Sequence, residues 1–276
     1  MFPFRLIACD IDGTLSMDNT LSLRSVHTLQ KLQQQGVSIV LCSGRSYPDV
    51  LSLRNQHLLA LDMLLLNGAM QVNAKGQILH ATAIKKQSAK MILQMLQKEP
   101  IAIGCYDETH IYSLEEEDRP SFQKHYLQSF TDTTPVLSCF KTITETDLPK
   151  PILKIELLEK DEEKRQRLQT RLSTLQEVKV TTSGWDNLEI TSPLVSKGTA
   201  LQTYVAQHGF TKEEVLVFGD SENDLSMFSC FPNSVAVANA CTQIKNAARY
   251  HCKEAKEDGV VQFLEMLIKE AVTNKK

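Results

Sequence analysis

Five short apolar runs punctuate the chain, and the segments between them have helical spacing. The runs cover Leu6–Cys9, Val37–Cys42, Met63–Leu66, Val215–Phe218 and Val235–Ala238. Continuous apolar runs of this length are typical of strands buried on both faces of a parallel sheet. Between the first two runs, Val26, Leu29 and Leu32 recur at helical spacing, and Gly36 is placed to end the helix. This pattern predicts a strand–helix–strand unit.

The C-terminal part of the chain repeats this arrangement. Ala200, Leu201, Tyr204 and Val205 form an apolar stripe just before the run at 215–218. The last segment, "DGVVQFLEMLIKEAV", is also amphipathic at helical spacing. We therefore expect both ends of the chain to build one α/β domain, a doubly wound parallel sheet of Rossmann-like type.

The middle of the chain has a different pattern. Strands are expected at 101–105, 110–113, 153–158, 178–181 and 188–191, and helices at 87–98, 121–130 and 161–175. Asn67-Gly68 is a turn signal before a hairpin in "MQVNAKGQIL". Helices on an antiparallel sheet predict an α+β domain inserted into the first one. We place the core domain at 1–81 and 189–276 and the inserted domain at 82–188.

Polar residues follow three of the core strands. The first strand runs into Asp10 and Asp12, the second into Ser43-Gly44-Arg45, and the fourth into the segment Asp220–Asp224. Ligands bind outside the carboxyl ends of strands in open parallel sheets, so these clusters should meet in one crevice. Lys197 opens the helix before the fourth strand and is placed to reach the same edge.

Several carboxylates in one crevice would repel each other and raise each other's pKa values. A hard divalent cation removes that cost, and oxygen ligands without histidine or cysteine indicate Mg²⁺. The ammonium of Lys197 adds a fixed positive charge, and Ser43 and the backbone around Gly44 add hydrogen-bond donors. This combination favours phosphoryl transfer, a reaction that needs strong stabilisation of charge.

Four motifs in this order, "DIDGT", "SGR", "SKG" and "GDSEND", resemble those of the haloacid dehalogenase (HAD) superfamily. Within it the chain is similar to the Cof-type phosphatases, which carry a large class IIB cap between the second and third motifs. The resemblance implies an α/β HAD core with an inserted α+β cap. Four ordered motifs carry far more information than a single D-x-D-G.

The resemblance also implies roles for individual residues. Asp10 would be the nucleophile that forms an aspartyl-phosphate, and Asp12 would protonate the leaving oxygen and then activate water. Lys197 would neutralise the phosphoryl group. Mg²⁺ would be held by Asp10, the backbone carbonyl of Asp12, Asp220 and Asp224. Substrate or phosphate would be bound by Ser43, Gly44, Arg45 and Asn223.

Simpler interpretations exist for single residues of this set. Asp224 could complement a helix dipole, and Ser43 could only cap the helix after Gly44. Arg45 could pair with a local acid, and Lys197 could be solvated. The single tryptophan, Trp185, is expected to pack in the interior, or else to line the pocket near the cap hinge. Tyr106 and His110 are expected to be structural.

Composition and charge exclude several classes of function. A net charge of −3 and a pI near 6.2 argue against a nucleic-acid partner. No apolar run approaches the length of about 18 residues that a membrane helix needs, and the N-terminus lacks the apolar region of a signal peptide. Seven scattered cysteines without a C-x-x-C pair indicate a reducing, cytoplasmic location.

The leading hypothesis is a Mg²⁺-dependent phosphatase that acts on a small phosphorylated metabolite, such as a sugar, polyol, flavin-precursor or vitamin phosphate. A monomer or small homo-oligomer is expected. Two alternatives stay open at this stage. A phosphomutase or phosphotransferase would share the first half-reaction, and a catalytically silent metabolite-binding protein could use the same fold.

Overall fold

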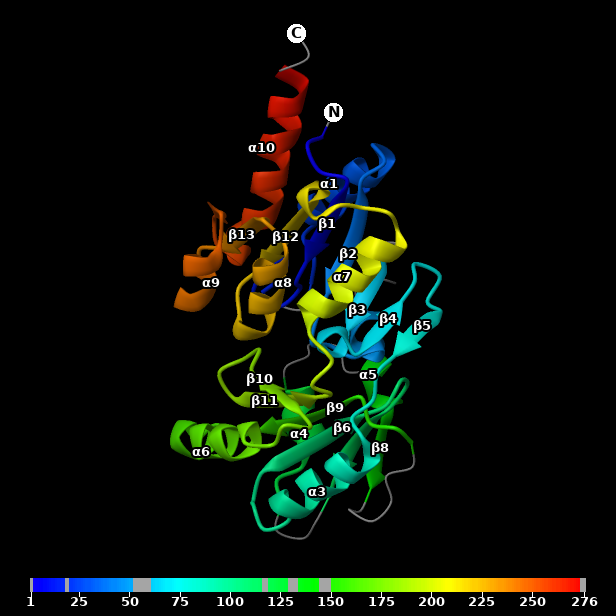
Figure 1. Ribbon diagram of the computed structural model, residues 1–276, viewed down its shortest axis with the longest axis vertical. Coiled ribbons are helices and arrows are strands. Elements are labelled where there is room, and N and C mark those ends of the chain that lie inside the picture. The colour runs from blue at the N-terminus through cyan, green and yellow to red at the C-terminus, as the bar shows by residue number, and fades with distance from the viewer. Residues whose placement is uncertain are drawn as a thin grey trace.

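The computed structural model describes residues 2–17, 20–51, 61–115, 119–128, 134–143 and 150–273. Two β-sheets dominate this part of the chain, one with eight strands and one with six. Figure 1 shows them one above the other, with both chain ends beside the larger sheet and the teal and green segments around the smaller one.

The eight-stranded sheet contains the strands that the apolar runs predict. Its order is β14-β13-β12-β1-β2-β3-β4-β5. The strands are β1 (Leu6–Cys9), β2 (Ser38–Cys42), β3 (Asp62–Leu65), β4 (Met70–Val72), β5 (Ile78–Ala81), β12 (Val215–Gly219), β13 (Asn233–Val237) and β14 (Tyr250–Cys252). Pairing is parallel from β14 to β3, and β4 and β5 form the expected antiparallel hairpin. The predicted doubly wound α/β class is confirmed.

Helices flank this sheet in two groups. They are α1 (Leu23–Gln34), α7 (Lys197–Gln207), α8 (Leu225–Cys230), α9 (Thr242–Ala247) and α10 (Gly259–Thr273), with short 3₁₀ turns η1 (Leu66–Gly68), η2 (Lys212–Glu214), η3 (Glu222–Asp224) and η4 (Ala255–Glu257). Helices α1 and α10 contact each other, and α8 contacts both α7 and α9. An ion pair between Arg24 and Glu265 joins α1 to α10 at the surface.

The six-stranded sheet has the order β10-β11-β9-β6-β7-β8. Its strands are β6 (Ala102–Tyr106), β7 (Ile111–Leu114), β8 (Phe140–Ile143), β9 (Lys154–Leu158), β10 (Lys179–Thr181) and β11 (Asn187–Thr191), and its helices are α3 (Lys86–Leu96), α4 (Phe122–Leu127), α5 (Thr134–Leu137) and α6 (Glu162–Ser173). All pairs are antiparallel except β7 with β8. Strand β8 was not expected from the sequence.

Packing explains why this arrangement is stable. Strand β1 is completely enclosed, since every side chain from Leu6 to Cys9 is at most 1% exposed. One face of the smaller sheet packs its apolar side chains with those of α3 and α6, including Ile92 and Leu168. On its other face, Tyr106 and Phe122 join the core of the larger sheet. Burial of this apolar surface is the main driving force for folding.

Strand β11 belongs to the six-stranded sheet and ends at Thr191. One expectation differs from the structure. The expectation that Trp185 packs in the interior is wrong, because the side chain is 68% exposed. Trp185 lies in the turn between β10 and β11. The proposed division into two domains stays a prediction.

Candidate active site

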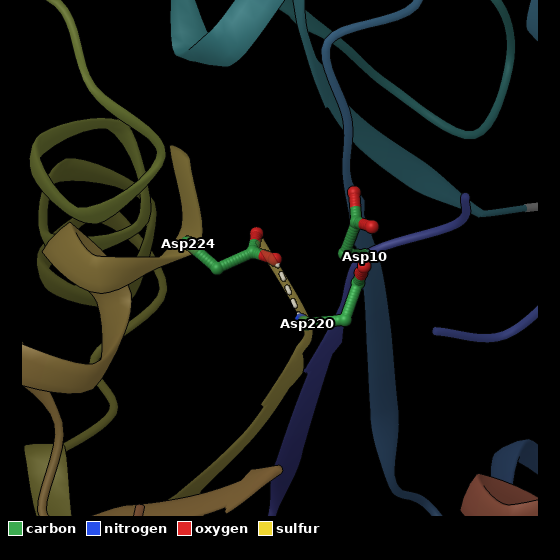
Figure 2. A group of neighbouring side chains, drawn as sticks. All are labelled: Asp10, Asp220 and Asp224. Carbon is green, nitrogen blue, oxygen red and sulfur yellow. Dashed lines mark hydrogen bonds between the residues drawn. The ribbon is translucent and has the colours of Figure 1, made fainter. Parts of the chain in front are cut away.

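Three carboxylates from two neighbouring strands meet at the carboxyl edge of the larger sheet. Asp10 directly follows β1, and Asp220 directly follows β12, its parallel neighbour. Asp224 closes the 3₁₀ turn η3 that comes next. One oxygen from each carboxylate lies within 4.8 Å of the others. Figure 2 shows the three side chains converging on one space, as the strand order predicts.

Lys197 provides the positive charge for this cluster. Its ammonium donates to Asp10 Oδ1 at 2.6 Å and to Asp224 Oδ1 at 2.7 Å, and the side chain is 1% exposed. Ser196 caps helix α7 by accepting from the Thr199 amide, which fixes Lys197 in the first turn. Although burial disfavours a charged lysine, the two carboxylates raise the pKa of Lys197 above its ordinary value.

The backbone around Gly13 allows Asp220 to approach β1 closely. Gly13 has a φ of +77°, and a Cβ at this position would lie 2.5 Å from Asp220 Oδ2. Only glycine satisfies both conditions. The hydroxyl of Thr14 donates to Asp220 Oδ1 at 2.6 Å, and the amide of Asp220 donates to Asp224 Oδ2 at 3.0 Å (Figure 2). The "DGT" segment therefore positions the second carboxylate of the cluster.

The donor set fits a hard divalent cation. Burial, only partly offset by Lys197, raises the pKa of Asp10 well above its ordinary value. Burial and the charge of Asp224 raise the pKa of Asp220 to about 6, although the hydrogen bond from Thr14 lowers it. A cation would relieve both penalties, and oxygen ligands alone suit Mg²⁺ better than a softer metal. The side chain of Asp12 is outside this cluster.

Asp12 instead pairs with Arg45. Arg45 Nε donates to Asp12 Oδ2 at 2.7 Å, and its NH2 group donates to Oδ1. The guanidinium is 8% exposed whereas the carboxylate is 50% exposed, so Asp12 presents an open side. Burial lowers the proton affinity of a guanidinium, but the hydrogen bonds and charge of Asp12 raise the pKa of Arg45 above its ordinary value. The local pairing considered for Arg45 is therefore present.

The remaining predicted residues divide into two groups. Gly44 and Asn223 line the same cavity as Asp10 and Asp12. Ser43 is fully buried, and its hydroxyl accepts from the Arg45 amide at 3.1 Å. This contact lies within the loop after β2, because the next helix begins at Tyr47, so the helix-capping interpretation of Ser43 is wrong. Asn223 donates to Asn67 Oδ1 at 3.0 Å, which connects the η3 turn to the turn after β3.

The cavity has a volume of about 170 Å³ and both sheets contribute to it. From the larger sheet come Asp10, Asp12, Gly44, Arg45, Ser221 and Asn223. The smaller sheet and its helices contribute Tyr126, Lys154, Glu156, Ser183 and Glu189. The space is smaller than the ~300–1,000 Å³ of most drug-sized ligand sites, so it suits a small molecule.

The residues from the smaller sheet were missed by the sequence analysis. Lys154 and Glu156 alternate with apolar residues in the otherwise hydrophobic strand "KIELL", and Glu189 occupies a similar place in "NLEIT". Charged side chains at alternate positions of an apolar strand point to one face of the sheet. Tyr106 is structural, as expected, since it is buried and donates to Glu156 Oε2 at 2.5 Å.

A family model for haloacid dehalogenase-like hydrolases matches residues 7–264, nearly the whole chain. The chain belongs to the haloacid dehalogenase-like hydrolases. The family resemblance inferred from the four motifs is thus confirmed, and with it the expected class of enzyme, because the relatives of this Cof-type group are named phosphatases.

Individual relatives align with almost the full length of the hydrolase. It is 27% identical to Phosphatase YwpJ of Bacillus subtilis, with 96% of this chain and 100% of that protein aligned. It is 23% identical to the B. subtilis 5-amino-6-(5-phospho-D-ribitylamino)uracil phosphatase YwtE, over 96% and 98% of the two chains. A solved haloacid dehalogenase-like hydrolase from B. subtilis superposes with a TM-score of 0.84 at 25% identity, over 95% of this chain and 99% of that chain.

The described helices of the hydrolase include none with the length and apolar character that crossing a membrane requires.

Proposed function

We propose that this hydrolase is a Mg²⁺-dependent phosphatase of a small phosphorylated metabolite and that it works through a phosphorylated Asp10. One observation carries the proposal. The carboxylate of Asp10 lies at the end of a rigid, buried strand, against the ammonium of Lys197, and in a cavity large enough for a small ester. A nucleophile needs this kind of fixed placement.

Three side chains would hold the metal: Asp10, Asp220 and Asp224, with the backbone carbonyl of Asp12 as a further oxygen ligand. Mg²⁺, when bound there, supplies charge neutralisation for the phosphoryl oxygens. The chain contributes the rest of the electrostatic field. Lys197 holds Asp10 and Asp224 in place. It also adds a positive charge that favours the arrival of an anionic group.

The reaction has two balanced steps. An oxygen of Asp10 bonds to phosphorus while the ester P–O bond breaks, and Asp12 gives its proton to the departing oxygen. Asp12 then takes a proton from water, whose oxygen bonds to phosphorus as the bond to Asp10 breaks. Inorganic phosphate leaves and Asp10 is restored. The half-exposed carboxylate of Asp12 lines the cavity together with Asp10, which supports the proposal that it acts in both proton transfers.

The cavity supports a small substrate, because its volume is about 170 Å³ and residues of the smaller sheet line it together with Asp10. A cavity of this size limits the size of the leaving group. The name of YwtE, which specifies a phosphorylated ribityl compound, also supports a small metabolite for this chain. A cytoplasmic location and a monomer or small homo-oligomer stay predictions.

The test is release of phosphate from p-nitrophenyl phosphate, with Mg²⁺ and with EDTA. We expect turnover that needs the metal and that falls by about a thousandfold or more in Asp10→Asn. The matched control is Asp161→Asn, a surface helix cap outside the cavity, which should keep wild-type turnover. Turnover that survives in Asp10→Asn, or that is unaffected by EDTA, would contradict the proposal.

A further inference from the structure

Three charged residues of the smaller sheet line the cavity, and the proposed mechanism does not use them. They are Lys154 and Glu156 on β9 and Glu189 on β11, which together we call the charged wall. All three are buried, with exposed fractions of 2%, 5% and 1%. Burying three charges is costly, so their presence in a cavity wall calls for a role.

Strand register explains how the charged wall is assembled. Glu156 and Glu189 are direct partners in the antiparallel pair of β9 and β11. Two like charges at such a position repel each other. Lys154 relieves the repulsion because its ammonium donates to Glu189 Oε1 at 2.9 Å and lies 3.1 Å from Glu156 Oε2. The same ammonium lies 4.4 Å from the centre of the Tyr106 ring.

The ammonium of Lys154 has no hydrogen left for a ligand. It has three hydrogens, and its third acceptor is the carbonyl oxygen of Gly44, at 2.9 Å. Gly44 belongs to the phosphate-binding segment expected after β2, so Lys154 ties the wall to that segment. A Cβ on Gly44 would lie 2.8 Å from Glu189 Oε1, which shows how closely the two parts approach.

The two carboxylates, in contrast, keep acceptor capacity. The other neighbours of Glu156 are neutral donors, the Tyr106 hydroxyl and the Asn187 amide. Glu189 Oε2 accepts from the Asn67 amide at 3.0 Å. A carboxylate has about four lone-pair positions, so each of the two can accept further hydrogen bonds from a ligand in the cavity.

The charge of the wall does not cancel. One ammonium faces two carboxylates, which leaves one net negative charge. Arg45, the other cation of the cavity lining, is engaged with Asp12. A leaving group in this space therefore meets acceptors for its hydroxyl hydrogens and a repulsive charge for any second anionic group.

We propose that the charged wall selects phosphate esters whose leaving group is neutral and rich in hydroxyl groups, and that it rejects those with a second anionic group. This inference rests on the proposed phosphatase function, because the wall acts on the part of the ester that departs from Asp10. It identifies Lys154, Glu156 and Glu189 as specificity-determining residues.

Two open-chain substrates of equal length test the inference. Sorbitol 6-phosphate ends in a hydroxymethyl group where 6-phosphogluconate ends in a carboxylate. We expect the wild-type hydrolase to prefer sorbitol 6-phosphate by about tenfold or more in kcat/KM, since like charges in a desolvated site are strongly disfavoured. Turnover of p-nitrophenyl phosphate, measured in parallel, tests the phosphatase function itself.

The variant Glu156→Gln removes the net charge with little change in shape. We expect the ratio of the two kcat/KM values to fall several-fold toward unity. The matched control is Glu163→Gln on α6, an exposed position away from the cavity, which should keep the wild-type ratio. A ratio between two substrates is insensitive to a general loss of active protein, and thermal unfolding reports whether each variant is folded.

The outcomes separate the two proposals. Suppose that the hydrolase turns over p-nitrophenyl phosphate but has equal kcat/KM for the two six-carbon esters, or does not turn over sorbitol 6-phosphate. Either result would overturn the inference about the charged wall and would leave the phosphatase function supported. A folded Glu156→Gln with an unchanged ratio would also overturn it. If Glu156→Gln does not fold, the ratio of the two kcat/KM values of the wild-type hydrolase alone tests the inference. Absence of turnover with every ester would overturn both proposals.

Discussion

The carboxylate of Asp12 is bound at both oxygens by the guanidinium of Arg45. The two side chains come from different strand ends, and Arg45 is buried while Asp12 is half-exposed. A planar guanidinium that meets a carboxylate at two points fixes its orientation as well as its position. Arg45 therefore holds the proposed acid in one direction relative to Asp10.

Replacing Arg45 by lysine should separate orientation from charge. Lysine keeps the positive charge but cannot form the two-point contact, so we expect kcat/KM for an alkyl ester such as sorbitol 6-phosphate to fall about tenfold or more. The loss should be smaller with p-nitrophenyl phosphate, whose leaving group departs without a proton. Equal losses with both esters would show that Arg45 does not act through Asp12.

Removing Lys197 should make stability depend strongly on the metal. In Lys197→Met the buried carboxylates of Asp10 and Asp224 lose their shared partner, at a cost of about 3–5 kcal/mol without metal. Mg²⁺ would replace part of the lost charge, so its addition should raise the Tm of the variant more than that of the wild type. Calorimetry with Mg²⁺ and with EDTA measures the shift in Tm of the variant and of the wild type. Equal shifts in the two proteins would contradict the prediction.

The pKa of Asp220, raised to about 6, predicts how the stability of the protein depends on pH. In the metal-free protein the folded state binds a proton at Asp220 more tightly than the unfolded chain does. This group therefore disfavours folding above about pH 6, and its cost declines as the pH falls below that value. Mg²⁺ removes the cost only where Asp220 is ionised, so the gain in Tm on adding Mg²⁺ should be larger at pH 7.5 than at pH 5. Asp220→Asn should reduce this difference, and a gain independent of pH would argue against Asp220 as a ligand.

A hydrogen bond between Tyr126 and Asp49 should contribute to stability across the two sheets. The Tyr126 hydroxyl on α4 donates to Asp49 Oδ2 at 2.7 Å, and among the described residues none donates to the buried Asp49 Oδ1. Tyr126→Phe should therefore lower the free energy of unfolding by about 1–2 kcal/mol. The control is Tyr47→Phe, which loses a longer bond of 3.3 Å to the Gly76 carbonyl. An equal or greater loss in the control, measured by urea unfolding, would contradict the prediction.

The eight-stranded sheet was predictable because its central strands are continuous apolar runs, such as Leu6–Cys9, with polar residues at their ends. The edge strands were harder to find. Strand β14 has the sequence "YHC" and β8 has "FKTI", and neither forms an apolar run or a clear alternation. Such short segments adopt extended structure because a neighbouring strand offers hydrogen bonds, which is a tertiary effect.

The candidate site was likewise only partly predictable from the sequence. Asp10, Asp220 and Asp224 meet because they follow neighbouring parallel strands at the carboxyl edge of one sheet, and these strands could be read from the sequence as apolar runs. The charged wall could not be placed in this way, because it depends on how the smaller sheet faces the larger one. Its only local signal was the alternation of Lys154 and Glu156 in an apolar strand. That signal shows a shared face but not what the face contacts.

Strand β11 ends at Thr191 and helix α7 begins at Lys197. One short connection therefore links Glu189 of the charged wall to the lysine that contacts Asp10. An insertion or deletion there would disturb substrate choice and chemistry together, whereas a substitution of Glu156 on β9 can change substrate choice alone. In related chains with other substrates, we expect diversity to accumulate at position 156, and the length of the 192–196 segment to be kept.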